Sequence, residues 1–121
     1  MNKLILIVED NEENLLLAEK ILNFYGYQTM SASLGQVALQ YCDANQFDLI
    51  LMDLSLPDID GLEVTRLLRK RENFQEVPII ALTAHAMRGI QETTEEAGMD
   101  AFLAKPFLPD DLIELITKYI R

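Results

Sequence analysis

The sequence predicts an α/β domain in which a five-stranded parallel sheet is covered by helices on both faces. Short apolar runs, which are typical of strands buried on both faces, alternate along the chain with longer amphipathic segments. Parallel strands need long crossover connections, so five alternating strand–helix units favour a doubly wound sheet. The chain has 121 residues, a common size for one domain, and no linker or repeat divides it. We therefore expect one domain over residues 1–121.

Five segments are expected to form the strands. The first, at 4–8, is an uninterrupted apolar run, and the segments at 49–52 and 79–82 repeat that pattern. The segment at 101–104 is a shorter version of it. The segment at 28–32 is more polar, which is typical of a strand at the edge of a sheet.

Capping residues indicate where the first two helices begin. Asn11 can cap the first helix, and Gly26 is expected to end it. Ser33 and Gln36 have the spacing of a capping box, so they predict a second helix that runs to about Ala44. The inner face of the first helix is expected to carry Leu15, Ala18, Leu22 and Tyr25.

The third and fifth helices also have recognisable starts. Asp60 and Glu63 have capping-box spacing, and the helix that they begin is expected to run to about Arg71. Pro109 occupies a favoured first-turn position of the last helix, which ends with basic residues near the negative end of its dipole. The side chains expected to be buried on this helix are Leu112, Leu115, Ile116 and Tyr119.

The fourth helix is expected over about 86–97, with Gly98 ending it. Gly89 lies inside this range, and large apolar residues are few. Glycine inside a helix costs roughly 1 kcal/mol relative to alanine, so we expect this helix to be marginally stable. Regions that switch between conformations are drawn from such parts of a protein.

The charge balance limits the functions that the chain can have. Twenty acidic residues against ten basic ones give a formal net charge of −10. Direct binding to nucleic acid needs clustered lysine and arginine, so this charge argues against that class of function. An acidic chain suits a divalent cation or a partner with a basic patch.

The sequence also bears on the compartment. Cys42 is the single cysteine, which rules out an internal disulfide and fits a reducing cytosol, and its place in a helical pattern predicts a packed thiol. No apolar run approaches the roughly 20 residues that a membrane helix needs. The short apolar run after Lys3 does not reach the length of a signal peptide. We therefore expect a cytoplasmic protein that does not bind a membrane.

Polar residues that can carry chemistry stand directly at the ends of the apolar runs. Glu9 and Asp10 follow the first strand, and Asp53 ends the third. Thr83 ends the fourth strand, and Lys105 follows the fifth. The carboxyl ends of parallel strands meet at one edge of the sheet, where functional groups collect. These five residues are therefore expected to form one site.

The residue types of this site fit phosphoryl transfer. Crowded carboxylates need a cation to remain ionised, and hard oxygen ligands suit Mg²⁺. A carboxylate such as Asp53 can attack a phosphoryl group and form an acyl phosphate. Lys105 could pair with one phosphoryl oxygen, and the hydroxyl of Thr83 could donate to another.

Four stretches together resemble the response-regulator receiver domain, the CheY-like family. They lie at 4–11, 48–61, 81–84 and 104–107, in the right order and on the right elements. The resemblance covers essentially the whole chain. It implies the flavodoxin-like strand order 2-1-3-4-5 and a role in two-component signal transduction through a phosphorelay.

The resemblance implies that Asp53 accepts a phosphoryl group from a phosphohistidine on a histidine kinase or a histidine phosphotransfer protein. It implies a Mg²⁺ site, with Mn²⁺ as a substitute, made by side-chain oxygens of Glu9, Asp10 and Asp53 and by the backbone carbonyl of Ser55. Phosphorylation would then switch the binding of a partner. We expect such a protein to be a binding module and not a turnover enzyme.

The resemblance assigns the switch to residues at the ends of the last two strands. Thr83 and the backbone of Ala84 would bind the phosphoryl group together with Lys105, and the Lys105–Pro106 peptide bond would be cis. Phe102 stands where the family often has tyrosine. Its ring can rotate inward and outward, but it lacks the hydroxyl that gives a hydrogen-bonded readout.

His85 and the partner surface complete these expectations. His85 stands two residues after Thr83, at a position that in the family often tunes how long the phosphate survives. Downstream proteins would bind the face formed by the fourth helix, the fifth strand and the fifth helix. The chain would be a monomer, or a dimer whose formation depends on phosphorylation.

Three alternatives remain open. The chain ends at Arg121, right after the last helix, which favours a stand-alone protein over a receiver excised from a hybrid kinase or a larger regulator. A Mg²⁺-dependent phosphatase with an aspartyl-phosphate intermediate needs a second acid two residues after the nucleophile, where Ser55 stands. A flavin-binding electron carrier needs a phosphate-cradling loop after the first strand, where acidic residues stand instead.

Overall fold

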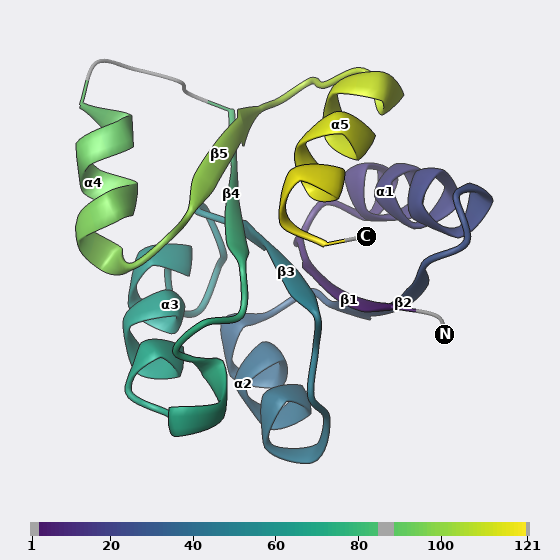
Figure 1. Ribbon diagram of the computed structural model, residues 1–121. Helices are drawn as coiled ribbons and strands as arrows, with labels where there is room; N and C mark the ends of the chain where they lie inside the picture. Colours follow the sequence, from purple (N-terminus) through teal and green to yellow (C-terminus); the bar gives the residue numbers. More distant parts are fainter. Residues whose placement is uncertain (1–2, 85–88, 121) are drawn as a thin grey trace.

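The computed structural model describes residues 3–84 and 89–120, in which strands and helices alternate around one sheet (Figure 1). The elements in chain order are β1 (Leu4–Val8), α1 (Glu12–Phe24), β2 (Gln28–Ala32), α2 (Gly35–Ala44), β3 (Leu49–Asp53), α3 (Gly61–Arg69), the 3₁₀ helix η1 (Glu72–Phe74), β4 (Ile79–Thr83), α4 (Ile90–Ala97), β5 (Ala101–Ala104) and α5 (Pro109–Tyr119).

The five strands form a single parallel sheet in the order β2-β1-β3-β4-β5. The helices α1 and α5 cover one face, whereas α2, α3 and α4 cover the other (Figure 1). This confirms the predicted single-domain, doubly wound α/β fold. The strand order reverses between β1 and β3, and in such sheets the site lies beyond the carboxyl ends of the strands at this point.

Alternate residues of the central strands point into two apolar layers. Leu6 and Val8 of β1 belong to the layer that contains α2 and α3 residues, whereas Ile5 and Ile7 belong to the layer that contains α1 and α5 residues. All five residues of β3 and all five of β4 are buried. The edge strands β2 and β5 remain partly exposed. The predicted burial of the central strands on both faces is therefore confirmed.

Two helix starts and one helix end are confirmed at the level of single hydrogen bonds. The side chain of Asn11 accepts a hydrogen bond from the N–H of Asn14 at 2.9 Å. The side chain of Asp60 accepts one from the N–H of Glu63, also at 2.9 Å. Gly26 follows α1 with a φ of 91°, a left-handed conformation that glycine adopts at little cost.

The start of α2 differs from the prediction. Leu34 is its N-cap residue and the helix begins at Gly35, so Ser33 does not cap it. The carboxylate of Asp58, in the loop before α3, accepts hydrogen bonds from the N–H groups of Gly35 and Gln36 instead. The capping-box prediction was wrong because an acceptor from a loop that is distant in sequence takes the place of the local one.

The third and fourth helices are shorter than predicted. α3 ends at Arg69, two residues before the predicted end at about Arg71, and η1 follows it. Gly89 is the N-cap residue of α4, with a φ of 88°, and does not lie inside the helix. The predicted positions 86–88 lie outside the described residues. Gly98 ends α4 with a φ of 100°, as predicted.

α5 begins at Pro109, as predicted. It buries Leu112 and Ile116 completely, and Leu115 partly. The layer between the sheet and α5 is therefore built largely from the residues that the sequence pattern indicated. Of the helices in the described part of the chain, none combines the length and the apolar character needed to cross a membrane.

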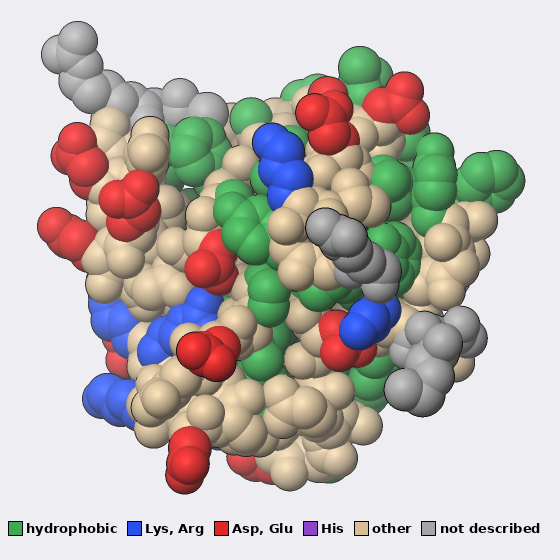
Figure 2. All heavy atoms as spheres, viewed as in Figure 1, with side chains coloured by type: hydrophobic (Ala, Val, Ile, Leu, Met, Phe, Trp, Pro, Cys, Tyr) green, Lys and Arg blue, Asp and Glu red, His purple; other side chains and the backbone are tan. Residues whose placement is uncertain are grey.

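Two tyrosines that were expected to be buried lie at the surface. Tyr25 follows the last turn of α1 and is 47% exposed, so it has left the buried stripe of the helix. Tyr119 is 39% exposed, and its hydroxyl donates a hydrogen bond to the carbonyl of Asp100 at 3.1 Å. Other apolar side chains exposed on α1, which lies near the right edge in Figure 2, are Leu16, Leu17 and Phe24.

Cys42 is buried in α2, and this burial is expected to slow the reaction of its thiol. Its side chain is packed as predicted, and burial raises the pKa of the thiol to about 11. Because the thiolate is the reactive form, we expect native protein at neutral pH to react with an alkylating reagent at least about a hundredfold more slowly than unfolded protein. The measurement compares labelling rates with and without urea; equal rates would contradict the burial of this side chain.

Candidate functional site

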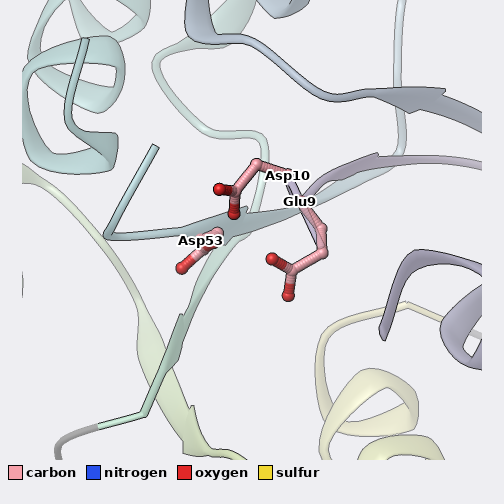
Figure 3. Close-up of side chains that lie close together, drawn as sticks. All are labelled: Glu9, Asp10 and Asp53. Carbon is pink, nitrogen blue, oxygen red and sulfur yellow. The ribbon is translucent and has the colours of Figure 1, made fainter. Parts of the chain in front are cut away.

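Three carboxylates lie together at the carboxyl edge of the sheet (Figure 3). β1 and β3 are parallel neighbours with Val8 opposite Met52, so Glu9, the residue after β1, lies beside Asp53, the last residue of β3. Glu9, Asp10 and Asp53 each offer an oxygen atom, and these oxygens lie within 4.8 Å of one another. Glu9 and Asp53 are buried, whereas Asp10 is exposed.

Lys105 brings a positive charge to the same place from the end of β5. Its Nζ lies 2.9 Å from Oε1 of Glu9 and 3.4 Å from Oδ1 of Asp53. The N–H of Lys105 donates to the carbonyl of Thr83 at 2.7 Å, which fixes the backbone of Lys105 against β4. The Lys105–Pro106 peptide bond is cis, the isomer that the resemblance implies. The four ionisable side chains thus form one charge cluster.

The charge cluster shifts the pKa values of its members in different directions. Burial raises the pKa of Glu9 to about 7, and its hydrogen bond with Asp53 adds to the rise, against the effect of Lys105. Burial also opposes ionisation of Asp53, but hydrogen bonds from Glu9 and from the N–H of Ser55, together with the charge of Lys105, lower its pKa. Burial would lower the pKa of Lys105, but the two carboxylates outweigh it and raise that pKa. Asp53 therefore stays ionised and Lys105 stays protonated at neutral pH.

The loop after β3 contacts the Asp53 carboxylate directly. The N–H of Ser55 donates to Oδ1 of Asp53 at 3.1 Å. Gly61 packs against the backbone of Asp53, and its N–H donates to the carbonyl of Leu54 at 3.2 Å. Ser55 itself is exposed, whereas Leu56 is buried in the core. The loop therefore leaves the strand in a defined direction beside the carboxylates.

Thr83 and Ala84 lie at the same edge of the sheet. Thr83 is the last residue of β4 and is only 5% exposed, while Ala84 directly follows it and is exposed. In the register between β3 and β4, Asp53 is opposite Leu82, so Thr83 stands one residue beyond the carboxylate. His85 lies outside the described residues.

Phe102 lies away from the carboxylates, within the β5 strand. It is half-buried and packs against the apolar layer under α2 and α3. It lines a cavity of about 280 Å³ with Gln91 and Thr94 of α4, and a second one of about 260 Å³ with Leu115 of α5. Phe102 therefore borders two hollows, one lined by residues of α4 and one by residues of α5.

The donor set fits a hard divalent cation. Carboxylate oxygens from three side chains at one point repel one another, and Lys105 offsets only part of that charge. Oxygen ligands of this kind, in a site with one exposed side, suit Mg²⁺, which keeps several waters. The same acids after β1 disfavour the phosphate of a flavin. The electrostatics of the site therefore match the cation predicted from the sequence.

The sequence pattern brought the charge cluster together but missed two contacts near it. Asp58 bonds to the start of α2, and Gly61 touches the backbone of Asp53. In the sequence both residues stand within the stretch at 48–61 that resembles the family, with no contact predicted for either. A hydrogen bond between positions 35 and 58 leaves no local signal, whereas a glycine directly after a helix cap could have indicated a close approach of two backbones.

Comparison with known proteins gives one consistent result. A family model described as the response regulator receiver domain matches residues 5–117. The polar-differentiation response regulator DivK of Brucella ovis is 40% identical over 120 residues, which cover 99% of this chain and 98% of that protein.

Solved structures agree with that result. The receiver domain of a sensor histidine kinase from Pseudomonas aeruginosa, with a magnesium ion coordinated in its active-site cleft, is 40% identical with a TM-score of 0.92; the match covers 99% of this chain and 98% of that one. The response regulator TrrA from Thermotoga maritima, in complex with Mg²⁺ and BeF, is 31% identical with a TM-score of 0.87, and the match covers 98% and 99% of the two chains.

Proposed function

Because this chain belongs to the family of response regulator receiver domains, we propose that Asp53 is the residue on which it accepts a phosphoryl group. The observation that carries the proposal is the place of this carboxylate. It ends the middle strand of the sheet, it is buried and held ionised, and two other acids and one lysine surround it. An aspartate with only a structural role would not require two further carboxylates and a lysine beside it.

The transfer is a displacement at phosphorus. An Oδ atom of Asp53 forms a bond to the phosphorus of a phosphohistidine on a kinase or a phosphotransfer protein, and the P–N bond breaks. The electron pair of that bond stays on the imidazole nitrogen of the donor. The product is an acyl phosphate on Asp53. The protein keeps the group, so it acts as a module that changes state and not as an enzyme that turns over a substrate.

The residues that would hold Mg²⁺ are Glu9, Asp10, Asp53 and the backbone carbonyl of Ser55. The carboxylate cluster supports this proposal, and two relatives hold Mg²⁺, one of them in its active-site cleft. When bound, Mg²⁺ offsets negative charge on the transferring oxygens. Asp10 is the exposed member of the set, so it would bind on the solvent side.

Lys105 and Thr83 would then bind the phosphoryl oxygens. The Nζ of Lys105 already lies 3.4 Å from the acceptor carboxylate, and a small movement away from Glu9 would bring it to an oxygen of the group on Asp53. The hydroxyl of Thr83 and the N–H of Ala84 lie one and two residues beyond the level of Asp53 and would donate to the remaining oxygens. His85 would modulate hydrolysis of the acyl phosphate.

The surface that reports phosphorylation would be the face made by α4, β5 and α5. Phe102 lines both hollows of that face, so rotation of its ring would alter both. A histidine kinase or phosphotransfer protein would supply the phosphoryl group, and a downstream protein would bind this face.

The function would reside in one domain over residues 1–121, in the cytoplasm, whether or not further domains accompany it.

Phosphoryl labelling tests the proposal. Wild-type protein with Mg²⁺ and a small acyl phosphate is expected to gain the mass of one phosphoryl group, whereas Asp53→Asn gains none, because an amide cannot form the acyl phosphate. Asp110→Asn removes an exposed carboxylate on α5, far from Asp53 in the sequence. It is the matched control and should label like wild type. Chelation of Mg²⁺ should suppress labelling in both.

Unchanged labelling of Asp53→Asn would show that another residue accepts the group. Steady release of phosphate from a simple phosphomonoester would instead support the phosphatase. Intact-mass spectrometry and a phosphate-release assay on the same samples separate these results.

A further inference from the structure

The loop between β3 and α3 is tied to a helix that is remote from it in sequence. The N–H of Gly35 donates to Oδ1 of Asp58 at 2.8 Å, and the N–H of Gln36 donates to Oδ2 at 2.9 Å. These are first-turn N–H groups of α2, and the N-cap residue Leu34 carries an apolar side chain that cannot accept them. The two bonds lower the pKa of Asp58, led by the one from Gln36, and keep it charged.

The backbone next to Asp58 also lies against the start of α2. A Cβ atom placed on Gly35 would stand 3.2 Å from the carbonyl oxygen of Ile59 and 3.3 Å from its Cβ. Glycine therefore permits the loop to approach the helix closely. The loop therefore contacts the start of α2 through its backbone as well as through the Asp58 carboxylate.

The same loop is fixed to the site at its first residues. The N–H of Ser55 donates to the Asp53 carboxylate, and Leu56 is buried. Its far end is fixed where Asp60 caps α3. Between these two anchors Pro57 and Asp58 are exposed, and the bonds from Asp58 to α2 hold that exposed part.

We propose that Asp58 is a positioning residue for the cation site: its bonds to α2 order the loop that carries the Ser55 carbonyl before any cation arrives. This inference rests on the proposed function, because the Ser55 carbonyl matters only if a cation binds there. A loop that is already ordered by folding loses little conformational entropy when the cation binds, so the affinity for the cation is higher. Asp58 itself touches neither the cation nor the phosphoryl group.

The test measures Mg²⁺ affinity by isothermal titration calorimetry on the whole protein. Asp58→Ala removes both acceptors, and we expect its dissociation constant to rise about three- to fivefold, less than the roughly tenfold or more typical of a residue that bonds to a metal ligand. Asp58→Asn keeps one acceptor oxygen and should give a smaller rise. Hydrogen exchange should also quicken at the amides of Ser55 and Gly61, whose bonds hold the two ends of the loop.

Gln40→Gly is the matched control. Gln40 is exposed in the middle of α2, so glycine there weakens the helix without contacting the loop. Urea unfolding establishes how far each variant is destabilised. The proposal requires that Gln40→Gly keep the Mg²⁺ affinity and the loop exchange rates of wild type, while Asp58→Ala binds Mg²⁺ more weakly and exchanges faster in the loop.

The possible failures are distinguishable. If wild type binds Mg²⁺ and Asp58→Ala binds it equally well, the positioning role is overturned and the proposed function stands. If Gln40→Gly weakens Mg²⁺ binding as much as Asp58→Ala does, Asp58 is only a cap for α2 and the positioning role is again overturned. If wild type does not bind Mg²⁺, the cation site of the proposed function is overturned, and this inference with it.

Discussion

Replacing Gly61 by alanine is expected to lower the free energy of unfolding by about 3 kcal/mol, the upper part of the range for overpacking a core. A methyl group on Gly61 would collide with the carbonyl oxygen of Asp53 and would stand 2.9 Å from Cγ of Met52. The first obstacle is backbone of the middle strand, which cannot move without distorting the sheet. Because that backbone carries the acceptor carboxylate, we also expect weaker Mg²⁺ binding and slower phosphorylation.

Urea unfolding and phosphoryl labelling measure these two effects on Gly61→Ala. Gly26→Ala is the control, because it adds the same methyl group where nothing lies within 4 Å. Its φ of 91° makes alanine unfavourable there by about 1 kcal/mol, but the residue is remote from the site. A Gly61→Ala protein as stable as wild type, with normal labelling, would show that the strand end accommodates the methyl group.

Replacing Arg69 by alanine is expected to cost about 3 to 5 kcal/mol of stability, the range for breaking a mostly buried charged network. The guanidinium donates to the carbonyls of Gly98 at 2.8 Å, Phe74 at 2.6 Å and Val77 at 2.7 Å. It also pairs with Asp100 at 3.0 Å, and its side chain is only 17% exposed. One side chain thus joins the end of α3 to the segments before β4 and β5.

Arg66→Ala is the control for Arg69→Ala. Arg66 lies on the same helix, but it is 49% exposed and pairs only with Glu63 in the described structure, so its loss should cost no more than about 0.5 kcal/mol. Arg69→Lys keeps the charge but cannot form the fork of bonds, and it should fall between wild type and alanine. Equal urea midpoints for the two alanine variants would contradict the role given to Arg69.

The order of the elements could be predicted from sequence because strands and caps leave local signals. The apolar runs fixed the central strands, and Asn11 and Asp60 cap the helices that they precede. The errors arose where contacts are not local. Ser33 has the right spacing for a capping box, yet Asp58 takes its place from across the fold. Tyr119 fits the apolar stripe of α5, yet it reaches out to the carbonyl of Asp100.

The charge cluster was predictable for a different reason. Parallel strands end at the same edge, so residues such as Glu9, Asp53 and Lys105 can be brought together without knowledge of any distance. What the sequence could not supply is the pairing within the cluster. Lys105 lies closer to Glu9 than to Asp53, and only the positions of the backbone decide that.

The strand order has a consequence for which parts of the molecule open often and which open rarely. β3 has two strands on either side of it and is buried throughout, whereas β5 is at the rim and is only partly covered. A rim strand and a short helix such as α4 can open locally at low cost, while the middle strand opens only when most of the sheet does. The acyl phosphate would therefore lie on the strand that opens least often, and the partner-binding face would lie on the elements that open most often. Brief opening of β5 and α4 would then allow contacts with different partners while the strand that carries the phosphoryl group stays in place.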